Sequence, residues 1–109
     1  MPYAMETQRL KGYATAEGTE RYYRRSQYDE YGSYDVSPQH FKMPLHSDLK
    51  ITTLGYGSYI GDPDDKTDFL MYDAIKQSVL SGGVNLIDTA PNFRYTKSER
   101  TIGKILTTL

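Results

Sequence analysis

The sequence has no cysteine, which excludes disulfides, thiolate metal sites and a cysteine nucleophile and leaves the redox compartment open. It also has little net charge: 13 basic residues face 14 acidic ones, and the formal charge of −1 gives no global reason to expect nucleic acid or an anionic membrane as partner. Long apolar runs are missing too, since none approaches the ~20 residues needed to span a bilayer. We therefore expect an intracellular protein, soluble or bound in a complex, with cytoplasm and mitochondrion (or another organelle) both open.

Residues 1–46 have few aliphatic side chains and many tyrosines. Seven of the eleven tyrosines lie in the first 34 residues, among arginine, glycine and acidic residues. This composition predicts a short helix around Glu17 to Ser26 but cannot build a core. We interpret 1–46 as a largely irregular N-terminal extension that contacts partners, because tyrosine offers contact area at low entropic cost. The expected contact residues are Tyr22, Tyr23, Tyr28, Tyr31 and Tyr34.

Arginines interleaved with aromatic residues, as in 21–34, are also typical of proteins that bind single-stranded nucleic acid. Asp29, Glu30 and Asp35 dilute the positive charge of this stretch. Contact with other protein subunits is therefore the favoured interpretation, and nucleic acid the disfavoured one.

Metal binding is not predicted. The acidic run at 62–68 resembles the start of a calcium loop, but an EF-hand needs glycine at its sixth position and glutamate at its twelfth, where this chain has Thr67 and Asp73. His40 and His46 have no partner ligands in view, so ordinary surface histidines are expected.

Residues 47–109 have the texture of a folded α/β segment. Glycine-punctuated β-formers predict one or two strands within 49–61, and an acidic cluster then opens a helix that ends at Gly82 and Gly83. A short apolar run at 84–90 is typical of a buried parallel strand. The final helix should open with a capping box of Thr96 and Glu99. The apolar positions expected on the two helices are Met71, Ile75, Val79, Ile102, Ile105, Leu106 and Leu109.

The order strand, helix, strand, helix predicts a partial (β/α)8 barrel of about two βα units. Parallel strands need a crossover connection and covered faces, and two strands cannot close a barrel. The remaining apolar edges must be covered by more chain, by another protein, or by the extension folding back.

Three stretches, "LGYGSYIG", "SGGVNLIDTA" and "SERTIGKIL", together resemble the start of an aldo-keto reductase, in the family's order and spacing. The resemblance implies a (β/α)8 barrel in which a nicotinamide cofactor delivers hydride to a carbonyl while a tyrosine gives the proton. It covers two of eight βα units, whereas a whole barrel needs ~250 residues.

By this resemblance Asp88 matches the family's catalytic aspartate, and Ser58 and Tyr59 match residues beside the nicotinamide; Asp88 also belongs to that cofactor site. The proton-donating tyrosine should stand five residues after Asp88, where this chain has Phe93, and Tyr95 is an imperfect replacement. The favoured prediction is therefore a non-catalytic structural or accessory subunit of a larger assembly, without cofactor. The alternative is the N-terminal fragment or split half of an NADP-dependent aldo-keto oxidoreductase, which would use NADP(H).

Overall fold

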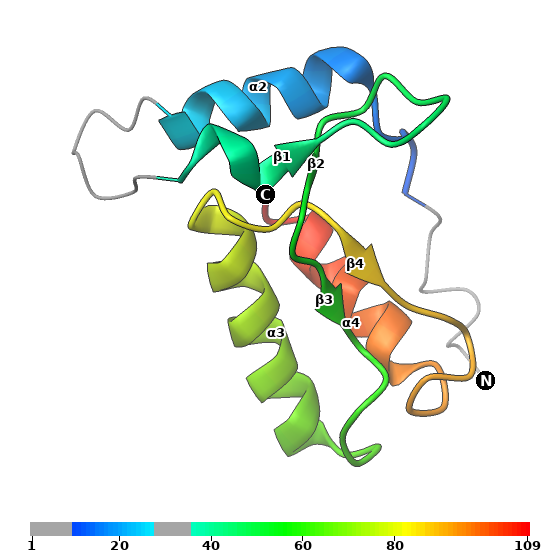
Figure 1. Cartoon of the computed structure of the whole chain (residues 1–109). Coiled ribbons are helices and arrows are strands. Elements are labelled where there is room, and N and C mark those ends of the chain that lie inside the picture. Colours follow the sequence, from blue (N-terminus) through cyan, green and yellow to red (C-terminus); the bar gives the residue numbers. More distant parts are fainter. Residues whose placement is uncertain (1–9, 28–35) are drawn as a thin grey trace.

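The computed structural model describes residues 10–27 and 36–109 as a mixed α/β structure (Figure 1). Its elements in chain order are α2 (Ala16–Gln27), the 3-10 helix η1 (Pro38–His40), β1 (Phe41–Lys42), β2 (Ile51–Thr52), β3 (Tyr56–Gly57), α3 (Asp65–Leu80), β4 (Ile87–Asp88) and α4 (Lys97–Leu106). The expected α/β class is confirmed. Within the two described ranges the strands form two separate pairs and no closed barrel, and the partial barrel stays a prediction. No helix in these ranges is long and apolar enough to cross a membrane.

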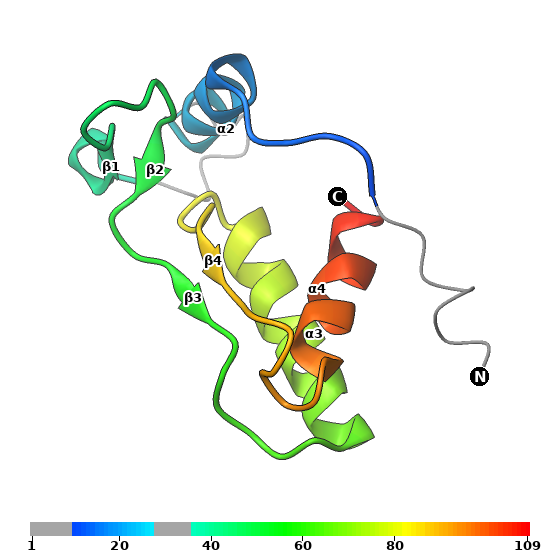
Figure 2. The same cartoon turned by 90° about the vertical axis from the view of Figure 1, so that its right-hand side faces the viewer.

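The second half of the chain contains the expected parallel pair. β3 and β4 run parallel with Tyr56 opposite Ile87. The amide of Tyr56 donates to the carbonyl of Leu86 at 2.9 Å, and that of Ser58 to the carbonyl of Asp88 at 3.1 Å. Figure 2 shows α3 and α4 on the same side of β3 and β4. The helices of this chain thus cover one face of the pair. Parallel sheets are usually covered on both faces.

The hydrophobic core lies between α3 and α4. Met71 and Ile75 stand four residues apart on α3, and Ile102 and Ile105 three apart on α4, so each pair shares one helix face. The partly buried residues packed against them are Tyr56, Tyr72, Val79 and Ile87. Since each fully buried aliphatic side chain contributes about 1.5–3 kcal/mol, this cluster is the main apolar stabilisation of the β3–α4 segment.

The start and end of α3 agree with the sequence prediction. Asp64 is the N-cap, and its carboxylate accepts a hydrogen bond of 2.8 Å from the amide of Thr67. The helix ends just before Gly82, whose φ of 86° is a left-handed conformation that favours glycine.

The start of α4 differs from the prediction. Thr96 is the N-cap residue, but its φ is 71° and its side chain caps no amide, so the predicted capping box with Glu99 is wrong. A capping side chain normally reaches the first-turn amides from an extended backbone, and the left-handed conformation of Thr96 departs from that geometry. Leu106 and Leu109 are exposed, so the apolar stripe of this helix is shorter than expected.

The described parts of residues 1–46 contain α2, η1 and β1. The expected short helix around Glu17 to Ser26 is confirmed. α2 lies over the antiparallel β1–β2 pair at one end of the chain (Figure 1). The ring of Tyr23 meets that of Phe41 edge to face at 5.0 Å. The hydroxyl of Tyr22 lies within hydrogen-bond distance of the carbonyls of Val79, in the last turn of α3, and of Val84, in the connection to β4. These two tyrosines therefore contact their own chain. A fold-back of the N-terminal extension is one of the three possibilities that the sequence leaves open.

The other three tyrosines named for partner contacts, Tyr28, Tyr31 and Tyr34, lie outside the described residues. The division of the chain at residue 46 stays a prediction. Strand β1 lies before that boundary and pairs with β2 beyond it.

Candidate functional site

Ser58 stands at the end of β3 and joins three elements. It is 0% exposed, and its hydroxyl donates a hydrogen bond of 2.8 Å to the carbonyl of Asp88 on β4. Its own carbonyl accepts a hydrogen bond of 2.6 Å from the hydroxyl of Ser98 on α4. The buried hydroxyl of Ser58 therefore donates its proton to a hydrogen bond within the fold.

Asp88 ends β4 with its side chain exposed. Its backbone carbonyl is the group that holds Ser58, while its carboxylate forms no ion pair with the lysines and arginines of the described ranges. The next residue, Thr89, has a buried hydroxyl with no hydrogen-bond partner in the described part of the chain. The carboxyl end of β4 thus presents a carboxylate and an unsatisfied hydroxyl side by side in sequence.

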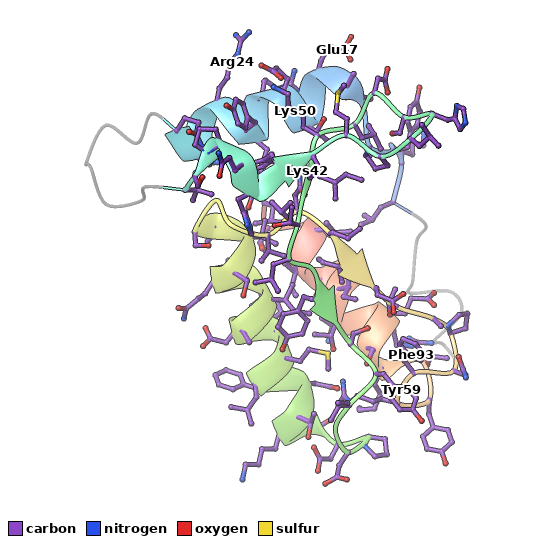
Figure 3. The ribbon with its side chains drawn as sticks, viewed as in Figure 1. Glu17, Arg24, Lys42, Lys50, Tyr59 and Phe93 are labelled. Atoms are coloured by element: carbon purple, nitrogen blue, oxygen red, sulfur yellow. The ribbon has the colours of Figure 1, made fainter. Side chains whose placement is uncertain are left out.

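Phe93 lies against Tyr59. The two rings meet edge to face with centroids 5.1 Å apart and an interplanar angle of 80°, and Figure 3 shows them beside each other near the end of β3. Such pairs contribute about 0.5–1.5 kcal/mol beyond their area of burial. At the position where the resemblance implies a proton donor, the chain places a hydrocarbon ring in a packing contact.

Tyr95 is 80% exposed and lies at an open surface hollow. The residues lining this hollow are Tyr59, Ile60, Gly61, Pro63, Asn92, Arg94 and Tyr95. The fold thus brings Tyr59 and Tyr95 to one surface, while Asp88 and Ser58 do not line it.

The turn that carries Tyr95 is strained. Arg94, Tyr95 and Thr96 have φ values of 52°, 54° and 71°, so three successive non-glycine residues are left-handed. Each such residue costs roughly 1–2 kcal/mol. Interactions elsewhere must hold this turn in place.

Arg94 supplies those interactions, because its buried guanidinium binds the segment that leads into α3. Its Nε donates to the carbonyl of Asp62 at 2.9 Å, and Nη2 to the carbonyl of Asp64 at 3.3 Å. The guanidinium also pairs with the Asp68 carboxylate, which in turn lies 3.0 Å from the ammonium of Lys97. The carboxylate of Asp68, and more weakly that of Asp65, raises the pKa of Lys97. We call this network the Arg94 clamp.

The Arg94 clamp is not predicted from the sequence. The acidic run at 62–68 indicates the N-terminus of a helix, and no sequence pattern singles out Arg94. A single arginine between an aromatic residue and a predicted helix could have suggested a buried partner for one of those acids. Nothing in the spacing of residues so far apart in sequence identifies Asp68 as that partner.

The described residues do not fit the nicotinamide cofactor that the resemblance implies. Ser58 is buried and its hydroxyl is bonded to Asp88, so it has no group to offer a ligand. Tyr59 is accessible, but one ring at an open surface supplies neither a phosphate site nor an enclosing pocket.

Comparison with known proteins finds no matching family model, no matching curated protein and no matching solved structure. The resemblance to aldo-keto reductases therefore depends on the three sequence stretches alone.

Proposed function

We propose that this chain is a non-catalytic structural or accessory subunit of a larger protein assembly, derived from an aldo-keto reductase. Its role is to present a folded surface to other protein subunits, without metal or nicotinamide cofactor. Function belongs to the site and not to the fold, so the proposal depends on the chemistry of the residues around Asp88.

The observation that carries the proposal is the position of Phe93. A hydride that arrives at a carbonyl carbon builds an alkoxide, which must be protonated or stabilised by a donor about 3 Å away. A phenyl ring can do neither, and this ring packs on Tyr59. The side chain of Asp88 has no lysine partner in the described ranges to tune a neighbouring hydroxyl.

The test is aldehyde turnover with NADPH by the chain purified together with its partners. We expect no turnover above the background of a preparation lacking the chain. A Tyr95→Phe variant is the matched comparison, because Tyr95 is exposed and its hydroxyl forms no hydrogen bond within the described residues. Turnover that is present in the native chain and disappears in Tyr95→Phe would show that Tyr95 is the donor, and the proposal would be wrong.

The second candidate is the N-terminal fragment or split half of an NADP-dependent aldo-keto oxidoreductase. The parallel β3–β4 pair favours it, because the backbone groups of Gly57 and Ile87 point away from the pair and have no strand beside them in the described ranges. Further strands from more chain or from a partner would satisfy them. A structure of the assembly decides: this candidate requires a lysine and a histidine within hydrogen-bond distance of Asp88 or Tyr95.

A further inference from the structure

The outward face of α2 is made of charged residues only. The exposed residues of this helix are Glu17, Arg21, Arg24 and Arg25. In Figure 3, Glu17 and Arg24 project from α2 away from the rest of the chain. Three of the four charges on this face are positive.

The opposite face holds the helix in a fixed orientation. The Tyr22 hydroxyl lies 2.6 Å from the carbonyl of Val79, Tyr23 packs on Phe41, and Ser26 is buried. Because these contacts fix the rotation of α2 about its axis, the three arginines leave the helix toward the solvent side of the molecule.

The described acids neutralise only part of the positive charge on the outward face of α2. Glu20 is shared between Arg24 at 3.2 Å and Lys50 at 2.8 Å, whereas Arg21 and Arg25 form no ion pair with described residues. In the full sequence residues 1–53 carry seven lysines and arginines against seven acids, and 54–109 carry six against seven. The positive charge is therefore a local property of the exposed face of α2.

The chemistry of this face favours carboxylates of a protein over the other anionic surfaces. A membrane helix needs an apolar side to enter the lipid, and the exposed positions of α2 include no apolar residue. Glu17 would repel a nucleic-acid backbone that followed the helix. The planar arginine fork matches a carboxylate through two hydrogen bonds, and arginine is enriched in protein interfaces.

We propose that Arg21, Arg24 and Arg25 dock an acidic segment of a partner subunit on the outward face of α2. This inference rests on the proposed function, since it names the surface and the partner chemistry through which the subunit is held. Arg21 and Arg25 lie four residues apart and face one side, so they fit two carboxylates of a single segment.

The experiment uses the tagged full chain purified with its assembly from the cells that make it. The R21K/R25K variant keeps both charges and introduces amines, which a zero-length carbodiimide reagent joins to carboxylates in contact. We expect cross-links from positions 21 or 25 to aspartates or glutamates of another protein. Cross-links only to acids of this chain, or no cross-link at all, would overturn the proposal.

A second pair of variants measures how much the face contributes. R21Q/R25Q and K66Q/K104Q each remove two positive charges, and all four positions are exposed. We expect R21Q/R25Q to reduce the partner recovered at moderate salt about tenfold and K66Q/K104Q to leave it unchanged. Equal losses in both variants, or RNA or anionic lipid lost from R21Q/R25Q in place of a protein, would contradict the inference. Aldehyde turnover of the same material is measured separately, so an active assembly would overturn the proposed function without affecting the cross-links.

Discussion

The hydroxyl oxygen of Tyr22 accepts a hydrogen bond of 3.2 Å from the amide of Val84, 62 positions along the chain. The same oxygen lies 2.7 Å from the carbonyl of Val84 and 2.6 Å from that of Val79, and its single proton can serve only one of them. Burial of the ring raises the pKa of this tyrosine, so the hydroxyl stays protonated. One side chain thus ties α2 to the connection between α3 and β4.

Tyr22→Phe should destabilise the full chain by about 1–2 kcal/mol, because the Val84 amide loses its acceptor and a carbonyl loses its donor. The free energy of unfolding in urea measures this. Tyr13→Phe is the matched control, since Tyr13 is 89% exposed and removal of its hydroxyl should change stability by less than about 0.5 kcal/mol. Equal effects of the two substitutions would show that the tie contributes nothing.

Arg94→Met should be the most destabilising single change in the β3–α4 segment, by about 3 kcal/mol or more. It leaves the Asp68 carboxylate without its arginine, removes the donors to the carbonyls of Asp62 and Asp64, and releases the strained turn. Arg94→Lys should recover only part of the loss, because an ammonium cannot reproduce the guanidinium fork. Thermal unfolding followed by circular dichroism gives both values. An Arg94→Met variant as stable as the native chain would show that the Arg94 clamp does not stabilise the fold.

Thr96→Gly should stabilise the chain by about 1 kcal/mol. Thr96 has a φ of 71° and caps no amide, so glycine removes backbone strain and loses only an exposed contact with Arg100. Thr107→Gly is the control, because Thr107 ends α4 with an ordinary φ of −72° and gains nothing from glycine. Urea unfolding of both variants is the measurement, and a loss of stability in Thr96→Gly would contradict the strain argument.

Asp64→Asn should make the free energy of unfolding depend less on pH in the acid range. Hydrogen bonds from Thr67 lower the pKa of Asp64 below its ordinary value of 3.8. A carboxyl whose pKa is lower in the folded state contributes stability that is present above the unfolded value and is lost as pH falls through the folded one. The difference between native chain and variant should therefore be largest above about pH 4 and shrink below it. Unfolding midpoints between neutral pH and pH 2 test this, and a difference that grows toward acid would reverse the assignment.

Phe93→Tyr should not create aldehyde turnover. No lysine is paired to Asp88 in the described residues, so no such group would lower the pKa of the new hydroxyl. NADPH consumption by the variant in its assembly is the readout. Activity in Phe93→Tyr would show that partner chains supply the missing groups and would favour the split reductase.

The sequence predicted the local features of this chain well, because each depends on neighbours within one or two turns. Asp64 caps α3 as an aspartate before an amphipathic run should, and Gly82 ends the helix where a left-handed residue is required. The parallel pairing of β3 and β4 also followed from the strand, helix, strand order. The absence of a tyrosine five residues after Asp88 is likewise visible in the sequence, which has Phe93 at that position.

Tertiary structure alone decided where long-range polar groups meet. Thr96 and Glu99 have the spacing of a capping box, yet the Arg94 clamp holds the turn left-handed and prevents the cap. Tyr22 lies in a tyrosine-rich stretch that predicts contacts with partners, and in the structure its hydroxyl bonds the amide of Val84 in the connection after α3. A hydrogen bond between residues tens of positions apart depends on how the packed helices place both groups. Local propensity describes only the conformation of neighbouring residues, so it cannot predict such a contact.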